Sequence, residues 1–287
     1  MTPLRQRMIE TMQLRGLAPR TQESYRSAVY QLARHSGISP ELLSEEQLRQ
    51  YFLFLIVDRQ LAPNTTTVAL NAIKVFYIST LRRPWPLRDL VRPPLPQKLP
   101  VVLTPEEIWR IIAQVRRPDY SVCLSVIAAC GLRLLEGVDV QVCQIDSARM
   151  QLLMRSSKGN KDRAVPLPSR TLSLLRAHWP RHRNPIWLFP TTPPEGQRHA
   201  TAAMDESGLQ KAFHKALSAA GVTKPATIHA LRLSWATQLV ENGVSIRVVQ
   251  LWMGHASPTT TAISTHLTQQ VQQCAAKALD ELTAGMP

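Results

Sequence analysis

Cysteines and long apolar runs are both scarce in this sequence, and their scarcity excludes several classes of protein. The 287 residues include four cysteines and no C-x-x-C pair, so neither a disulfide framework nor a zinc site is expected. We expect buried free thiols, as in a reducing cytosol, at Cys123, Cys130, Cys143 and Cys274. The apolar run 52–57 is too short to cross a bilayer, and the N-terminus lacks the apolar core of a signal peptide. The prediction is a cytoplasmic protein without a membrane segment.

Acidic residues are scarce relative to basic ones. The chain has 34 Lys and Arg against 20 Asp and Glu, a net charge of +14. Residues 1–100 hold 14 basic and 7 acidic side chains and residues 101–287 hold 20 and 13, so the excess is not confined to a tail. A polyanion such as DNA or RNA is the expected partner, although charge alone also fits an ordinary basic surface. The sequence has no Walker motif and no acidic cluster suited to a divalent metal, so no cofactor, metal or nucleotide is expected.

The chain is long enough for two domains, and its prolines indicate where they separate. Helical patterns fill residues 1–81, whereas residues 82–100 contain six prolines, which exclude a helix interior or a central strand. This segment is expected to be a stiff extended linker. Helical patterns dominate again in residues 101–287, with strand-like segments at 149–155 and 163–168. The prediction is a mainly α protein with a small β-sheet in its second domain.

Local signals mark several helix ends. Ser44 with Gln47 and Thr104 with Glu107 have the spacing of capping boxes, which begin helices. Glycines stand where helix C-caps are expected, at Gly221, Gly243 and Gly254. The segment 268–283 has the apolar spacing of a final helix.

The first candidate site is the pair Arg133 and Glu136. The two residues are three apart on an expected helix, where they would share one face. Arg133 emerges from the apolar segment 122–135, and a guanidinium in such surroundings requires an anion. Either a ligand or Glu136 itself, in a structural ion pair, satisfies that requirement.

The second candidate site is the turn between the two expected strands. It contains three cations, Lys158, Lys161 and Arg163. A flexible turn can carry a lysine into a site, and a lysine donates a proton readily once its pKa is lowered. A solvated hairpin tip is the alternative interpretation.

Two further candidates contain histidine. His229 and Arg232 lie three residues apart at the start of an expected helix, so both can donate hydrogen bonds to one phosphate. His255 directly follows Gly254 at an expected helix C-cap, where a histidine considered alone is more often structural.

Taken in order, Arg-x-x-Glu, a lysine in a β-turn, His-x-x-Arg and Gly-His resemble the phage-integrase family of tyrosine recombinases. The resemblance covers essentially the whole chain, and its most diagnostic stretch is HALRLSWATQLVENGVSIRVVQLWMGH, residues 229–255. It implies a helical SAM-like N-terminal domain in residues 1–81 and a tyrosine-recombinase catalytic domain in residues 101–287.

The resemblance also implies a role for each candidate residue. Arg133 and Arg232 would clamp the scissile phosphate, and Lys158 would protonate the departing 5′ oxygen. His229 and His255 would donate hydrogen bonds or transfer protons. Glu136 would orient its neighbours. The residues expected at the DNA are Arg133, Lys158, Lys161, Arg163 and Arg232.

The partners implied by the resemblance are duplex DNA and further copies of the chain. Family members act as tetramers on two DNA sites, and the helix 268–283 would dock on a neighbouring subunit, with packing on its own subunit as the alternative. A bacterial, nucleoid-associated protein of the cytoplasm is expected.

The nucleophilic tyrosine of the family is missing from its usual place. That position, nine residues after His255, is occupied by Ser264, and the last tyrosine of the chain is Tyr120. A seryl oxygen would fall about 4 Å short of the tyrosyl one, and an alcohol ionises less readily than a phenol. We therefore expect a chain that binds DNA without cleaving it, either an engineered knockout or a natural variant. Serine acting as the nucleophile is the third possibility.

Two other functions use a similar set of residues. A non-catalytic DNA-binding or architectural protein could retain the phosphate pocket, and a relaxase similar to type IB topoisomerases has similar active-site groups. The length of the chain and its helical start favour the recombinase.

Overall fold

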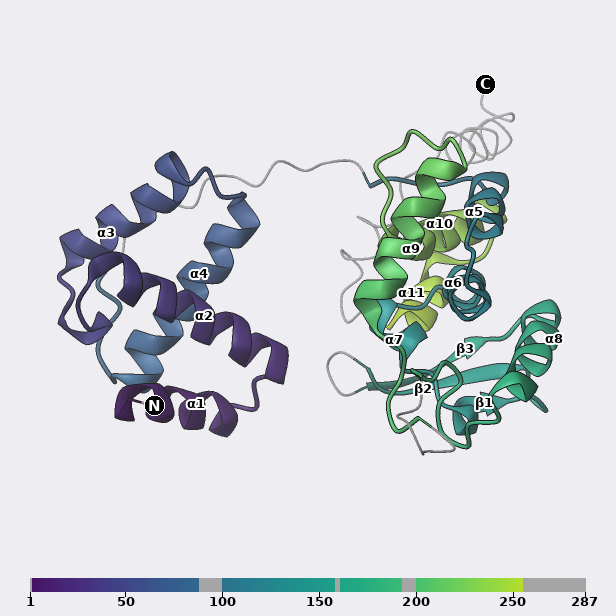
Figure 1. Cartoon of the computed structure of the whole chain (residues 1–287), viewed down its shortest axis with the longest axis horizontal. Coiled ribbons are helices and arrows are strands. Elements are labelled where there is room, and N and C mark those ends of the chain that lie inside the picture. The colour runs from purple at the N-terminus through teal and green to yellow at the C-terminus, as the bar shows by residue number, and fades with distance from the viewer. Residues whose placement is uncertain (1, 88–99, 158–160, 193–199, 255–287) are drawn as a thin grey trace, which may run out of the picture. The chain divides into compact units, whose positions relative to one another are not determined.

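The computed structural model describes residues 2–87, 100–157, 161–192 and 200–254. The chain divides into two compact units, Met1–Lys98 and Leu99–Pro287, and the division falls within the expected linker. Figure 1 shows a helical first unit and a second unit of helices with a small sheet. Within the described residues, no helix is both long and apolar enough to span a membrane.

Four α-helices form the part of the first unit that the structure describes. Prolines occupy the first turns of three of them, where a missing N–H costs nothing. The third begins at the predicted capping box, in which Ser44 and Gln47 exchange hydrogen bonds. The helices are α1 (Pro3–Leu14), α2 (Pro19–Ser36), α3 (Glu45–Leu53) and α4 (Pro63–Val75), with a 3₁₀ turn at Pro40–Leu42.

Helices α3 and α4 both end in π-helical turns, which the sequence patterns did not predict. These turns span Phe54–Asp58 and Phe76–Thr80. In each, the backbone N–H that follows the turn donates to the carbonyl five residues earlier, from Arg59 to Phe54 and from Leu81 to Phe76. A positive φ follows each turn, at Gln60 and Arg82, and ends the helical path.

The core of the first unit extends beyond residue 81 into the segment expected to be linker. Leu87 is buried in this core, and Trp85 packs against it. The guanidinium of Arg83 donates to the carbonyl of Glu41 at 2.6 Å. Residues through Leu87 therefore belong structurally to the first unit.

The second unit contains seven α-helices among its described residues. The first of them begins at the predicted capping box of Thr104 and Glu107. The helices are α5 (Pro105–Ala113), α6 (Pro118–Cys130), α7 (Leu134–Val138), α8 (Ser169–His178), α9 (Glu206–Ala219), α10 (Ile228–Glu241) and α11 (Ile246–Met253). Gly254 is the C-cap of α11, with a left-handed backbone, as predicted.

The sheet of the second unit is a three-stranded antiparallel meander. Strands β2 (Gln151–Ser157) and β3 (Lys161–Pro166) form the predicted hairpin, and the short β1 (Ile145–Asp146) pairs with the other side of β2. Leu152 pairs with Val165, and both are buried. The sheet therefore directs one face into the core of the unit.

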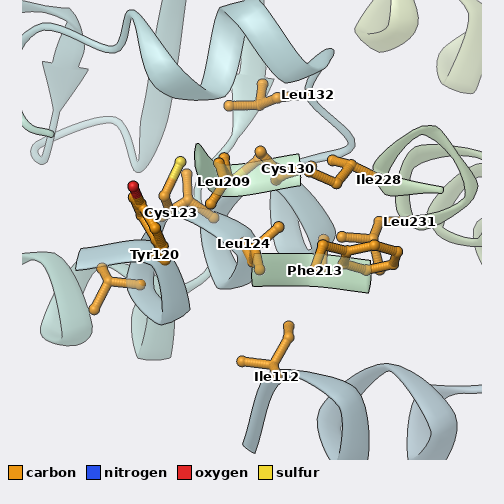
Figure 2. Close-up of a cluster of buried hydrophobic side chains, with 14 of the residues drawn as sticks. Ile112, Tyr120, Cys123, Leu124, Cys130, Leu132, Leu209, Phe213, Ile228 and Leu231 are labelled. Carbon is orange, nitrogen blue, oxygen red and sulfur yellow. The ribbon is translucent and has the colours of Figure 1, made fainter. Parts of the chain in front are cut away.

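Helices α5, α6, α9 and α10 supply much of the remaining core. Figure 2 shows apolar side chains of these helices gathered in one cluster, among them Phe213 of α9 and Leu231 of α10. Cys123 and Cys130 on α6 are buried free thiols, as expected, and burial raises the pKa of the Cys130 thiol to about 12. Cys143 is exposed, so the expectation of a buried thiol was wrong there, and Cys274 lies outside the described residues.

The chain enters the second unit along α10. The backbone N–H of Leu103 donates to the Ser234 hydroxyl at 2.7 Å, and the Gln238 amide donates to the Leu103 carbonyl at 3.1 Å. The ammonium of Lys224 donates to the Val102 carbonyl at 3.0 Å. Three side chains thus hold two consecutive residues in place.

Candidate active site

The Arg-x-x-Glu motif forms a helix N-terminus rather than one face of a helix. Arg133 has an extended backbone immediately before α7, and Glu136 is the third residue of that helix. The Glu136 carboxylate accepts the backbone N–H of Arg133 at 2.8 Å and its guanidinium at 2.6 Å. The spacing of three residues is therefore set by capping geometry, in which the third helical residue reaches back to the N-cap.

Arg232 is buried at the centre of the site. Its side chain is 1% exposed, and it lies on the first turns of α10. It donates to the carbonyl of Gly131 at 2.7 Å and to the carbonyl of Met253 at 2.5 Å. One guanidinium thereby connects the segment before Arg133 with the end of α11.

Arg163, which is expected at the DNA, points toward Glu136. It donates to both carboxylate oxygens of Glu136, at 2.9 and 2.6 Å, and to the carbonyl of Trp252 at 2.7 Å. Its side chain is 6% exposed. The sequence contained a signal for this orientation, because alternate residues of a strand share a face and Arg163 alternates with Val165 and Leu167.

Glu136 is surrounded by positive charge. Burial raises the pKa of its carboxyl, but hydrogen bonds and charge from Arg163 and Arg133 outweigh burial and lower that pKa to about 2. A third guanidinium, of Arg232, lies 3.8 Å from the same carboxylate. Three guanidiniums thus surround one carboxylate, and burial together with the charge of Arg133 lowers the pKa of Arg232.

His229 lies one turn before Arg232 on α10. Partial loss of hydration, followed by the charges of Arg232 and Arg133, lowers the pKa of its imidazole. The residue nevertheless keeps exposed surface. A neutral imidazole at the edge of a positive cluster can either donate a hydrogen bond or accept a proton.

A close contact between two helices fixes the backbone before Arg133. Gly131 ends α6 with φ +60°, and a Cβ there would lie 2.3 Å from the Trp235 ring of α10. The Trp235 indole N–H donates to the Ala129 carbonyl at 3.0 Å. The glycine therefore lets α10 approach the turn that presents Arg133.

The structure brings together five of the predicted site residues, Arg133, Glu136, Arg163, His229 and Arg232. Lys158, His255 and Ser264 lie outside the described residues, as does the segment 268–283. Lys161 is part of the β3 backbone, but its side chain is not described. Sequence reasoning missed the carbonyls of Trp252 and Met253, because no side-chain pattern marks a backbone acceptor.

The assembled groups suit an anion with several oxygens. Guanidiniums donate in a planar fork that matches phosphate, and they stabilise charge that develops on phosphate oxygens. Among the described residues, no three His, Cys, Asp or Glu side chains are grouped to hold a metal ion.

Comparison with known proteins agrees with this geometry. Residues 101–271 match the model of the phage integrase family, and residues 4–87 match the N-terminal SAM-like domain of phage integrases. The y4qK protein of Sinorhizobium fredii is 40% identical over 91% of this chain and 83% of its own length. An integrase/recombinase of Escherichia coli is 32% identical over 86% of this chain and 84% of its own length.

Solved structures give the same fold. The XerH site-specific recombinase, in a post-cleavage complex with its palindromic difH substrate, superposes with a TM-score of 0.67. At 20% identity it covers 94% of this chain, and this chain covers 83% of it, which is a likeness of fold. The two matched domain models, the relatives and the arginine cluster agree: the chain belongs to the phage integrase family of tyrosine recombinases.

Proposed function

We propose that this chain is a site-specific DNA recombinase with a competent phosphate pocket and no competent nucleophile. It binds duplex DNA, and Arg133, Arg232 and His229 hold the scissile phosphate. Lys158 and His255 complete the pocket by resemblance to the family. In the form with tyrosine at position 264, the enzyme cleaves and rejoins strands through a covalent 3′-phosphotyrosine.

The observation that carries this proposal is the cluster of three guanidiniums at Glu136. Arg133, Arg163 and Arg232 surround this carboxylate. A phosphodiester placed against the cluster brings negative charge to these guanidiniums, whose planar forks match its oxygens. The charge grows further in the transition state, so the same groups stabilise it more strongly than the ground state.

The residue at position 264 decides whether strands are cut. A seryl oxygen falls about 4 Å short of a tyrosyl oxygen, and a misplacement of ~1 Å can cost on the order of 100-fold in rate. The proposed state is therefore binding without cleavage. A non-catalytic DNA-binding role is the second candidate, because Ser264 occupies the nucleophile position while the arginine cluster is intact.

The proposed assembly follows the family. Four copies act on two duplex sites, and the helix 268–283 docks on a neighbouring subunit. The apolar spacing of this segment supports the proposal.

The experiment compares the Ser264 chain with its Ser264→Tyr variant. Bound sequences are first selected by the Ser264 chain from a random duplex pool, and the recovered site is then given a nick that traps the intermediate. The Ser264 chain should bind without forming an adduct. The Ser264→Tyr variant should form a slow-migrating covalent species on denaturing gels, with a free 5′ hydroxyl on the DNA.

The control adds Arg133→Ala or Arg232→Ala to the Ser264→Tyr variant. Either change should abolish the adduct, because the transition state loses a guanidinium. An adduct of the Ser264 chain mapped to Ser264 would show that serine is the nucleophile. Binding without any adduct from the tyrosine variant would favour the non-catalytic role.

A further inference from the structure

Arg163 connects three segments of the second unit. It stands on β3, its guanidinium holds Glu136 of α7 through both oxygens, and its Nε–H donates to the carbonyl of Trp252 on α11. Figure 1 shows α11 beside β3, in agreement with this contact. These bonds use all three nitrogens of the guanidinium.

The local packing leaves Arg163 little freedom. In the hairpin it pairs with Met154, which is buried, so the pleat directs both residues toward the core. A Cβ at Gly254 would lie 3.0 Å from the Arg163 Cδ, so the glycine allows the side chain to lie against the end of α11.

Two arginines hold consecutive carbonyls at the C-terminus of α11. Arg163 binds the carbonyl of Trp252, and Arg232 binds the carbonyl of Met253. The last carbonyls of a helix have no partner within the helix and carry partial negative charge, so cations stabilise them. The end of α11, two residues before His255 in the sequence, is thereby tied to the arginine cluster.

Glu136 would attract the other arginines more strongly if Arg163 were absent. Arg133 already binds its Oε1 at 2.6 Å, and the Arg232 guanidinium lies 3.8 Å from its Oε2. With Arg163 in place, each carboxylate oxygen of Glu136 accepts a hydrogen bond from the Arg163 guanidinium. The carboxylate then competes less with a phosphate for Arg133 and Arg232.

We infer that Arg163 is a positioning residue of the phosphate pocket and not a contact to DNA. It neutralises Glu136 and fixes the end of α11, and by these two contacts it sets Arg133 and Arg232 for a phosphodiester. This inference rests on the proposed function for the identity of the ligand.

The first test is the salt dependence of binding. Arg163→Met in the Ser264 chain is titrated with a 40-bp duplex of arbitrary sequence at several salt concentrations. Each phosphate contact contributes about 0.9 to the slope of log K against log salt. The slope for Arg163→Met should equal that of the parent chain. A slope smaller in magnitude by about 0.9 would identify Arg163 as a phosphate contact and overturn the inference.

The second test separates binding from reaction. In the Ser264→Tyr background, Arg163→Lys and Arg163→Met should slow adduct formation at saturating protein by on the order of 100-fold, with duplex affinity within about 3-fold. Arg149→Met is the matched control, because it removes an exposed arginine that pairs with Asp146 before the same hairpin. The control should form the adduct at the parent rate.

Rescue tests the role of Glu136. If the carboxylate, once it has lost Arg163, disturbs Arg133 and Arg232, Glu136→Gln added to Arg163→Met should restore about 10-fold of the lost rate, a non-additive result for residues in contact. The double variant also removes the carboxylate charge that Arg163→Met leaves with one partner fewer, so the double variant can be tested even where Arg163→Met alone does not fold. If adduct formation slows without rescue by Glu136→Gln, or does not slow in folded variants, the ion pair of Arg163 with Glu136 only stabilises the fold.

A spectroscopic readout keeps this inference separable from the proposed function. In the Ser264 chain labelled at histidine Cε1, the His229 signal is assigned with His229→Gln and titrated by NMR. Arg163→Lys keeps the charge but loses the bidentate geometry, so Arg133 and Arg232 should shift toward Glu136 and the His229 titration should move by about half a pH unit. An unmoved titration would contradict the inference. A moved titration together with no adduct from the Ser264→Tyr variant would refute only the proposed function.

Discussion

At the scale of the residue, Glu136 makes the second unit sensitive to acid. Its pKa is about 2 in the folded chain against an ordinary value of 4.5. A carboxyl whose pKa is lowered by folding stabilises the protein above its unfolded pKa and loses that contribution as the pH falls toward its folded pKa. The loss should amount to about 3 kcal/mol between pH 5 and pH 2.

Urea unfolding followed by tryptophan fluorescence measures this contribution, since five of the six tryptophans lie in the second unit. Glu136→Gln should be less stable at pH 5 and should lose less stability on acidification than the parent. Asp162→Asn, which removes an exposed carboxyl from the same unit, should keep the parental pH dependence. A parental pH dependence in Glu136→Gln would mean that other carboxyls control acid unfolding.

At the scale of the element, the contact between Gly131 and Trp235 should make the packing of α6 against α10 sensitive to substitution of the glycine. Gly131→Ala places a Cβ 2.3 Å from the indole ring in a backbone with φ +60°. Overpacking and a left-handed backbone both destabilise, by about 2–4 kcal/mol together. Gly221→Ala is the matched control, because its φ is +65° and nothing lies within 4 Å of the added Cβ.

The control should cost about 1 kcal/mol, the price of the backbone conformation alone. Chemical unfolding of both variants by tryptophan fluorescence gives the difference that belongs to the helix contact. Equal losses at the two glycines would show that α10 can move away from α6, and that the close approach does not hold Arg133.

Sequence patterns predicted the elements best where the signal is local. The capping boxes at Ser44 and Thr104 depend on residues three apart, and both are confirmed. The contact of Gly131 with Trp235 joins residues far apart in the chain, so no short pattern contains it.

The arginines of the site also show that short sequence patterns do not predict contacts between distant residues. The types and order of Arg133, His229 and Arg232 identified the family, but not the direction in which each side chain points. Arg163 is expected at the DNA because its turn is basic, whereas its alternation with Val165 indicates the inward direction that its side chain takes. The exposed Cys143 and the two π-helical turns had no signal that the patterns could detect.

At the scale of the whole molecule, charge should dominate the affinity for DNA. Both parts of the sequence carry excess Lys and Arg, within a net charge of +14. If six or more phosphates are contacted, the affinity of the full chain for a duplex should fall by roughly 10³-fold or more between about 50 and 200 mM salt. Fluorescence anisotropy with a labelled duplex measures the slope of log affinity against log salt concentration. An affinity that does not change with salt would show that the basic side chains do not bind the DNA phosphates.

The attachment of Leu103 to α10 also has a mechanical meaning. Ser234 and Gln238 grip the chain where it enters the second unit, and the same helix carries His229 and Arg232. A force applied to the chain before Leu103 is therefore transmitted to α10 before it is transmitted to the sheet. Tension on the chain where it enters the second unit would act on Lys224 and on α10, the helix that carries His229 and Arg232.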